Sequence, residues 1–195
     1  MRPQALDGQG TRETHLAADV AVEPMAEHHL PQVLAIEQRA YPKPWSERLF
    51  RSELAQSATR RYVVASEGDG TRRLLGYGGV LVQAGEAHIT NVAVDPVERR
   101  RKIATRLLVE LMRGARELAA QAATLEVRTG NTGARNLYER FGFVPVGVRP
   151  GYYADTGEDA LIMWLHDIDE PSYAERLRGI EAELDHPPVN GHEDS

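Results

Sequence analysis

The spacing of apolar and polar residues divides most of the chain into short strands and helices. Alternation with a period of two, or a short apolar run ended by a turn signal, predicts a strand. The predicted strands are residues 18–25, 62–66, 74–82, 88–94, 123–128, 143–149 and 160–166. Apolar residues at helical spacing predict helices over 26–39, 46–56, 103–118 and 131–141. The order is one strand, two helices, three strands, a helix, a strand, a helix and two strands.

This order predicts a mixed sheet with helices on both faces. The three consecutive strands are separated by short turns, which is typical of an antiparallel meander. The longest helix follows them and carries Ile103, Leu107 and Leu111 on one face. Two local signals support the helix boundaries. Ser46 is a good N-cap for the second helix, and Gly142 is a natural end for the last one.

The composition indicates one domain of an ordinary globular protein. The chain has 195 residues, of which 42% are hydrophobic and 27% are charged. It contains no cysteine, which excludes disulfides, thiolate metal sites and a cysteine nucleophile. No apolar run has the length of a membrane-spanning helix, and the polar N-terminal segment lacks the apolar stretch of a signal peptide. We therefore expect a cytoplasmic protein.

The formal net charge of -6 is concentrated at the C-terminal end. Residues 167–195 contain nine acidic and two basic side chains, so the rest of the chain is close to neutral. We expect residues 1–15 to be a disordered lead, residues 16–166 to form the domain, and residues 167–195 to be an acidic, solvated tail. Three apolar residues of the tail share one helical face and predict one short helix: Leu177, Ile180 and Leu184.

Four consecutive cations stand where the longest helix begins: Arg99, Arg100, Arg101 and Lys102. Cations at a helix N-terminus oppose the helix dipole, at a cost of ~0.3–1 kcal/mol each when exposed. A bound polyanion would reverse this effect, because free backbone N–H groups and basic side chains both favour phosphate. The alternative is a solvated basic turn, and the charge alone leaves both interpretations open.

The residues around these cations resemble the acetyl-CoA signature of the GNAT acetyltransferases. A strand ends in Val94-Asp95-Pro96, and residues 99–104 then open a helix. In that family the backbone amides of this loop hold the CoA pyrophosphate, and a glycine is expected where Lys102 stands. We expect Lys102 to keep ordinary helical dihedrals, so that its Cβ does no harm and its ammonium adds a phosphate contact.

Further blocks resemble the ribosomal-protein alanine N-acetyltransferases, the RimI family within GNAT. They are Ile36-Glu37-Gln38-Arg39-Ala40 with Pro44-Trp45-Ser46-Glu47, Leu125-Glu126-Val127-Arg128 with Asn136-Leu137-Tyr138-Glu139, and Tyr152-Tyr153 with Glu158-Asp159-Ala160. The resemblance runs from about Val20 to Leu165. It implies a GNAT fold, with a central, mostly antiparallel sheet, one splayed parallel pair and helices on both faces. It also implies acetyl-CoA as cosubstrate.

The resemblance implies a role for individual residues. Glu126 matches the family's proton acceptor and Tyr138 its proton donor. The residues implied to contact acetyl-CoA lie on a strand, on the basic loop and at the start of a helix: Val92, Ala93, Val94, Arg99, Arg100, Arg101, Lys102, Ile103, Ala104, Thr105 and Asn131. Without the resemblance, Glu126 would be an ordinary outward strand residue and Tyr138 part of an apolar helix face.

Elementary chemistry agrees with these roles. An α-amino group has a pKa of ~7.7–8.0, so the attacking amine must first lose a proton, which a carboxylate can accept. The CoA thiolate leaves with a pKa of ~8.5, and a phenol with a pKa of ~10 can protonate it. Since a thioester is already activated and no cysteine is present, we expect direct attack in a ternary complex, without a metal.

Two loops have no other explanation and are candidates for binding the acceptor. They contribute Tyr41, Trp45, Tyr152, Tyr153 and Asp155. The second loop is acidic, which suits a cationic N-terminal peptide, and a polar hairpin tip is an equal alternative.

These observations favour an enzyme that acetylates the terminal alanine of a small-subunit ribosomal protein, with no nucleic acid or membrane as partner. Two alternatives stay open. One is a GNAT enzyme for a small-molecule or lysine amine. The other is a CoA-binding regulatory module without catalysis, which the lysine at position 102 makes worth testing.

Overall fold

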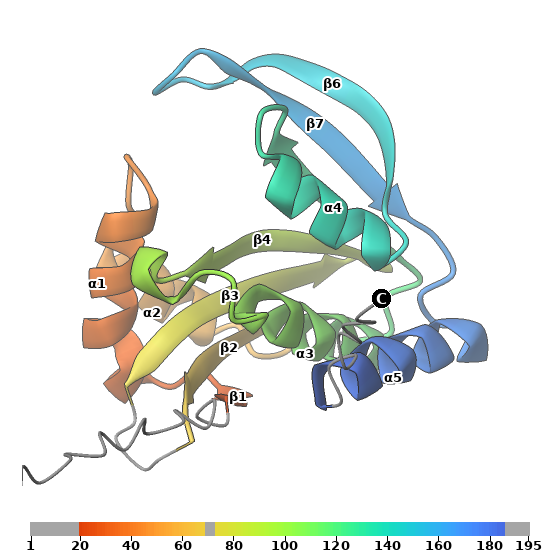
Figure 1. Cartoon of the computed structure of the whole chain (residues 1–195), viewed down its shortest axis with the longest axis horizontal. Helices are drawn as coiled ribbons and strands as arrows, with labels where there is room; N and C mark the ends of the chain where they lie inside the picture. Colours follow the sequence, from red (N-terminus) through yellow and green to blue (C-terminus); the bar gives the residue numbers. More distant parts are fainter. Residues whose placement is uncertain (1–19, 69–72, 186–195) are drawn as a thin grey trace, which may run out of the picture.

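The computed structural model describes residues 20–68 and 73–185 (Figure 1). In chain order the elements are β1 (Val20–Pro24), the 3-10 turn η1 (Glu27–His29), α1 (Leu30–Ala40), α2 (Glu47–Leu54), β2 (Arg60–Glu67), β3 (Leu74–Gln83), β4 (Glu86–Val94), the 3-10 turn η2 (Pro96–Glu98), α3 (Ile103–Glu117), β5 (Ala122–Arg128), α4 (Thr132–Arg140), β6 (Val144–Tyr153), β7 (Glu158–Leu165) and α5 (Pro171–Asp185). The predicted order of strands and longer helices is confirmed. The expected disordered lead, and the tail past residue 185, lie outside the described residues.

The seven strands form one sheet in the order β1-β2-β3-β4-β5-β7-β6. Neighbouring strands are antiparallel except β4 and β5, which run parallel. This parallel pairing is short and joins Glu86–His88 to Ala122–Thr124. Beyond it the two strands separate, and Figure 1 shows β4 diverging from the β6–β7 hairpin to which β5 is paired. The expected sheet, mostly antiparallel with one splayed parallel pair, is confirmed.

Alternation along β2 explains how helices cover both faces of the sheet. Tyr62 and Val64 are buried in a cluster with residues of α1 and α2, whereas Ala65 is buried with residues of α3. Since successive side chains of a strand point to opposite faces, α1 and α2 lie on one face and α3 on the other. A further cluster joins α3 to α4, α5 and the second half of the sheet.

Helix ends follow the signals in the sequence. The Oγ of Ser46 accepts a bond from the backbone N–H of Leu49 (3.3 Å), which confirms Ser46 as the N-cap of α2. Gly142 follows α4 with a φ of +98°, a conformation that glycine adopts without strain. One boundary differs from the prediction. Because Tyr153 pairs with Glu158, residues 150–153 and 158–159 extend the two strands beyond the predicted ends, and the loop between them is shorter than expected.

The acidic C-terminal segment belongs to the folded body up to residue 185. α5 packs on α3, and the three apolar residues expected to share a helical face are buried: Leu177, Ile180 and Leu184. The helix prediction is confirmed, but the expectation of a solvated tail does not hold here. The net charge of the segment suggested a solvated tail, but the acidic residues lie between apolar residues that share one helical face. Of the helices described, none is long and apolar enough to cross a membrane.

Candidate active site

A cavity of about 990 Å³ opens where β4 and β5 separate. Residues of β4, the loop before α3, and the first turns of α3 and α4 line it, together with Tyr41 from the segment after α1. The volume suits a ligand of cofactor size. Past His88, no strand among the described residues pairs with β4 on this side, so its backbone groups there are available to bond a ligand, apart from the Val92 carbonyl, which accepts from the Tyr41 hydroxyl.

The structure gathers ten of the eleven residues expected to contact acetyl-CoA. The ten that line the cavity are Val92, Ala93, Val94, Arg99, Arg100, Lys102, Ile103, Ala104, Thr105 and Asn131. The exception is Arg101, whose guanidinium pairs with Glu98 and lies 3.5 Å from Glu67. Bonds from Arg101 and Arg73 hold the pKa of Glu98 below its usual value. Arg101 therefore anchors the loop to its neighbours and is turned away from the cavity.

Lys102 is the N-cap of α3 and does not have the helical dihedrals expected from the sequence. Its φ is +58° and its ψ is 16°, in the left-handed region, and Arg100 also has a positive φ of +71°. The reason is that α3 begins only at Ile103, so the chain has to turn between η2 and the helix. The expectation of ordinary dihedrals is wrong. The resemblance implies a glycine at this position, and a glycine would adopt these left-handed dihedrals without strain.

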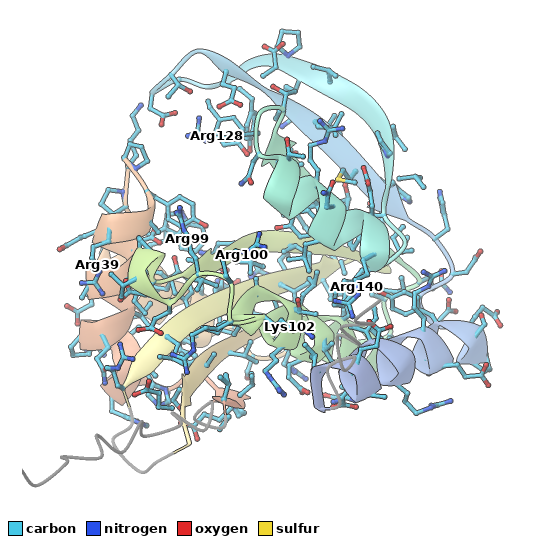
Figure 2. All side chains as sticks on the ribbon, in the orientation of Figure 1. Arg39, Arg99, Arg100, Lys102, Arg128 and Arg140 are labelled. Carbon is cyan, nitrogen blue, oxygen red and sulfur yellow. The ribbon has the colours of Figure 1, made fainter. Side chains whose placement is uncertain are left out.

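The start of α3 has the features of an anion-binding site. Lys102 makes no side-chain capping bond, and the first N–H groups of a helix have no intrahelical partner. Arg100 and Lys102 have positive φ and Arg101 between them does not, and such alternation is typical of an anion-binding nest of backbone N–H groups. Figure 2 shows Arg99, Arg100 and Lys102 along this loop. These groups fit the charge and the acceptor oxygens of a pyrophosphate.

Glu126 lies on the face of β5 that points away from the main core. Buried and half-buried residues alternate along β5, so Leu125 and Val127 face the core and Glu126 faces the other side. Its side chain is 13% exposed, and its carboxylate oxygens lie 3.3 Å from Nε2 of His88 and 3.2 Å from Nη1 of Arg149. The carboxylate is therefore held between basic groups of β4 and β6. It does not line the cavity.

Tyr138 lines the cavity from α4, and 9% of its surface is exposed. Its ring packs edge-on against Phe143, with 5.9 Å between centroids, in the cluster that also holds Leu125 and Val127. Burial, with a smaller contribution from Tyr153, raises the pKa of Tyr138 to about 12. The phenol therefore keeps its proton at neutral pH and is able to donate it.

Glu126 and Tyr138 lie on opposite faces of β5. A base for the amine and an acid for the thiolate must act on different atoms, which stand on either side of the carbonyl carbon under attack. Groups on opposite faces of β5 are separated in a way that is compatible with two such roles. The two roles stay predictions.

A buried glutamate fixes the segment after α1. One carboxylate oxygen of Glu37 accepts from the backbone N–H of Trp45 (2.8 Å), and the other accepts from the Tyr77 hydroxyl. Burial raises the pKa of Glu37, and these two bonds oppose the rise. The Tyr41 hydroxyl donates to the carbonyl of Val92 (3.3 Å) and lines the cavity, whereas Trp45 does not line it. Of these two acceptor candidates, only Tyr41 adjoins the cofactor strand.

Two acidic side chains of the second candidate acceptor loop share one cation, Arg128 of β5. Asp155 pairs with Arg128 (2.8 Å), and Arg128 also pairs with Glu158 (3.3 Å) and stacks on the ring of Tyr153, 3.9 Å from its centroid. The acidity that suited a cationic peptide is therefore partly balanced by this cation. The Tyr153 hydroxyl donates to the backbone of β5 (3.4 Å), and Tyr152 is 44% exposed. This loop can therefore contact an acceptor through its aromatic side chains.

The sequence pattern does not mark His88 and Arg149 as partners of Glu126. They belong to β4 and β6, which lie far apart along the chain and on either side of β5 and β7 in the sheet. The parallel pairing of His88 with Thr124 places His88 beside Glu126 on the same face. No local motif marks these contacts, since they depend on the register between strands.

The comparisons with known proteins agree with this geometry. Residues 30–143 match the family described as the Acetyltransferase (GNAT) family. The chain belongs to the GNAT acetyltransferases. This match spans the candidate cofactor loop, Glu126 and Tyr138, and it ends before β6.

Two curated GNAT relatives carry names that state an activity. A Salmonella typhimurium protein named "[Ribosomal protein bS18]-alanine N-acetyltransferase" is 35% identical over 138 residues, which are 70% of this chain and 90% of that protein. A Mycobacterium tuberculosis protein named "N-alpha-acetyltransferase RimI" is 40% identical over 133 residues, which are 66% of this chain and 79% of that protein.

A solved structure supports the same relationship. The crystal structure of the ribosomal-protein-S18-alanine N-acetyltransferase from Escherichia coli aligns with a TM-score of 0.67 and 31% identity, over 76% of this chain and 94% of that one. A NatC complex bound to a Gag peptide and CoA aligns with a TM-score of 0.67 at 20% identity, which supports the fold alone. The fold class predicted from the sequence is thus shared with known GNAT proteins.

Proposed function

We propose that this chain transfers the acetyl group of acetyl-CoA to the N-terminal α-amine of a protein. The acceptor we propose is the terminal alanine of a ribosomal protein of the bS18 type. The observation that carries the proposal is the cavity lined by the expected cofactor residues, with Tyr138 in its wall and Glu126 on the other face of β5. The names of the relatives then supply the acceptor.

The cofactor side of the proposal uses two parts of the cavity wall. The backbone groups of β4 from Val92 to Val94 would bond the pantetheine arm, as an additional strand would, and Tyr41 would yield the Val92 carbonyl if the arm needs it. The uncapped start of α3 would bind the pyrophosphate, with Arg99 and Arg100 as charge partners. Acetyl-CoA would thus lie along the gap between β4 and β5, with its thioester near Tyr138.

The chemical steps balance with the groups present. Glu126 accepts a proton from the acceptor's ammonium, directly or through water, and the neutral nitrogen attacks the thioester carbon. The tetrahedral intermediate collapses, the C–S bond breaks, and the Tyr138 phenol protonates the leaving thiolate. The second proton that the nitrogen loses as it becomes an amide returns to the Tyr138 phenolate, directly or through water, and Glu126 releases its proton to solvent. Burial raises the pKa of Tyr138, and the same dry surroundings raise that of the thiol, so the transfer stays feasible.

His88 and Arg149 would keep the base in place during this transfer. Each contacts a different oxygen of the Glu126 carboxylate, at 3.3 Å and 3.2 Å, so the carboxylate is held from two directions. Thioester transfer of this kind needs no metal, and the absence of a metal stays a prediction. Within the described part of the chain, no three His, Asp or Glu side chains are grouped as metal ligands would be.

A panel of peptides incubated with acetyl-CoA tests the proposal. The panel contains a peptide with a free terminal alanine, its N-blocked form, the same peptide with another first residue, and an N-blocked peptide with an internal lysine. We expect acetylation of the free alanine terminus and none of its blocked form, read by mass spectrometry. Acetylation of the lysine peptide or of small amines alone would replace this proposal with the alternative GNAT activity.

With a ribosomal protein as acceptor, we expect a cytoplasmic enzyme and no membrane or nucleic acid as partner.

A non-catalytic module that binds CoA is the second candidate, and the left-handed Lys102 is the observation that favours it. If lysine obstructs the loop, Lys102→Gly should tighten acetyl-CoA binding at least ~10-fold, or ~1.4 kcal/mol, in calorimetry. Binding by the wild type without turnover on any peptide would give the same conclusion. Unchanged or weaker binding in Lys102→Gly, together with peptide acetylation, supports the enzyme.

A further inference from the structure

The C-terminal end of α5 lies beside the start of α3. The two helices run antiparallel, since Arg116 near the end of α3 donates to the carbonyl of Glu170 (2.9 Å), while Lys102 at its start donates to the carbonyl of Glu183 (3.2 Å). Figure 1 shows α5 alongside α3, with the dark-blue end of α5 near the beginning of α3. α5 lies beyond residues 30–143, which match the GNAT family.

The last turn of α5 bonds two cations from the start of α3, of which Lys102 lines the cavity. Lys102 Nζ donates to the carbonyl of Glu183 (3.2 Å), and Arg106 Nη2 donates to the carbonyl of Leu184 (3.4 Å). Carbonyls in the last turn of a helix have no intrahelical partner and carry partial negative charge, so they are good acceptors for these cations. Lys102 is the residue at which α3 begins, and it lines the cavity.

The same turn of α5 also reaches α4. The carboxylate of Glu183 pairs with Arg140, the last residue of α4, at 2.5 Å. Earlier in α5, the guanidinium of Arg176 donates to the backbone carbonyl of Arg140 (3.5 Å). Figure 2 shows Lys102 at the start of α3 and Arg140 at the end of α4. Glu183 thus contacts both helices that border the cavity, one through its backbone and the other through its side chain.

We propose that Glu183 is a positioning residue for acetyl-CoA binding. By joining the start of α3 to α4, it sets the separation of the two cavity walls and holds the loop around Lys102 in its left-handed turn. The inference rests on the proposed function only in taking acetyl-CoA as the ligand. Glu183 does not line the cavity, so it acts through Lys102 and Arg140 and does not touch the ligand.

Because Glu183 is negatively charged, one substitution can distinguish an electrostatic effect on acetyl-CoA binding from a structural one. Acetyl-CoA is a polyanion, so removing a nearby negative charge should tighten its binding if Glu183 acts only through its electric field. If Glu183 acts by holding the two walls together, removing its charge should weaken binding. The two explanations therefore predict opposite signs for one substitution.

The experiment measures acetyl-CoA affinity by calorimetry on the full chain. Because the Glu183 side chain is 63% exposed, we expect Glu183→Gln to raise the dissociation constant only roughly two- to fivefold. Arg140→Gln should act to the same extent, and the double variant should be no worse than either single one. The exchanged pair, Glu183→Arg with Arg140→Glu, should recover most of the affinity. The KM for the peptide should stay unchanged throughout.

Glu181→Gln is the matched control. Glu181 also joins α5 to α3, through Arg113 at 2.5 Å, but neither residue lines the cavity. This variant should lower the thermal midpoint as much as Glu183→Gln and leave the acetyl-CoA affinity unchanged. Tighter or unchanged binding in Glu183→Gln, or an equal loss in Glu181→Gln, overturns the inference. If the wild type binds acetyl-CoA but acetylates no peptide, the proposed function fails and this inference stands, whereas absence of binding overturns both.

Discussion

The two helices that border the cavity begin in different ways. At α4, the Oδ1 of Asn131 accepts from the N–H of Ala134 (3.1 Å), whereas α3 begins at a left-handed Lys102 with no side-chain cap. The first turn of α4 is therefore satisfied without a ligand, and the first turn of α3 is not. Basic residues alone are a weaker sign of an anion site, since Arg101 belongs to the same cationic run and is paired away from the cavity.

This difference separates three contributions that can be measured independently. The start of α3 should govern acetyl-CoA affinity, and the start of α4 should govern the stability of the fold. Glu126 and Tyr138 should govern the chemical step, because they stand near the gap between the strands and outside both helix starts. If a variant at one of these three places changes the quantity assigned to another place, this division of roles is wrong.

The largest effect is expected from Glu126→Gln, which removes the proposed base and keeps the shape of the side chain. The kcat should fall by ~10²–10⁴, the usual contribution of a general base, while the dissociation constant of acetyl-CoA changes little. Steady-state kinetics with a terminal-alanine peptide and calorimetry check the two parts. Glu86→Gln, on the neighbouring strand, serves as the control. A near-normal kcat in a folded Glu126→Gln protein would mean that another group is the base.

Tyr138 should make the fold less stable in alkali. Its pKa rises from 10.0 to about 12 on burial, so the folded state holds this proton more tightly than the unfolded state. Unfolding then releases a proton above pH ~10, and stability falls as pH rises toward 12, by up to ~2.7 kcal/mol for two pKa units. The thermal midpoint of Tyr138→Phe should fall less steeply with pH over this range than that of the wild type. The exposed Tyr152→Phe is the control, and equal slopes in wild type and Tyr138→Phe would refute the expectation.

Arg100→Ala tests the anion site at α3. Losing one charge-assisted bond to a phosphate should cost ~1.5 kcal/mol, or roughly a tenfold loss of acetyl-CoA affinity. The affinity of the wild type should also fall with salt, and less steeply in the variant. Arg101→Ala is the matched control, since Arg101 does not line the cavity. The comparison fails if Arg101→Ala weakens binding as much as Arg100→Ala, or if wild-type affinity ignores salt.

Asn131→Ala tests the other helix start. Removing the cap of α4 should lower the free energy of unfolding by ~1 kcal/mol, seen as a lower midpoint in thermal or denaturant unfolding. Asn131→Asp keeps an acceptor oxygen and should stay close to the wild type. Asn131 also lines the cavity, and the sequence suggested that it contacts CoA. A large loss of acetyl-CoA affinity without a loss of stability would favour that direct role over the capping role.

The smallest effect is expected from Lys102→Gly. Glycine relieves the left-handed strain at this position but adds freedom to the unfolded chain, so the net stabilisation should be ~0.5 kcal/mol. Arg101→Gly, one residue earlier, lacks a positive φ and should be destabilising by roughly 0.5–1 kcal/mol. Unfolding experiments on the two variants compare them directly. Equal destabilisation by both would show that position 102 has no need of a left-handed residue.

Local signals in the sequence were sufficient for most of the fold. The period of the apolar residues predicted the order of strands and longer helices, and Ser46 and Gly142 marked helix ends that the structure confirms. These features depend on neighbouring residues along the chain, so they can be read without knowing the tertiary contacts. The motif around residues 99–104 also located the cavity wall, because a loop and the helix after it form one continuous segment.

Tertiary structure alone decided the rest of the site. His88 and Arg149 contact Glu126 only because of the register of β4, β5, β7 and β6. Arg101 does not line the cavity, because its guanidinium lies beside Glu98 and Glu67. The left-handed Lys102 follows from where α3 begins, and the packed acidic segment follows from the apolar surface that α3 offers it. Contacts between distant segments depend on how whole elements pack, and the residues next to each position in the sequence do not encode that packing.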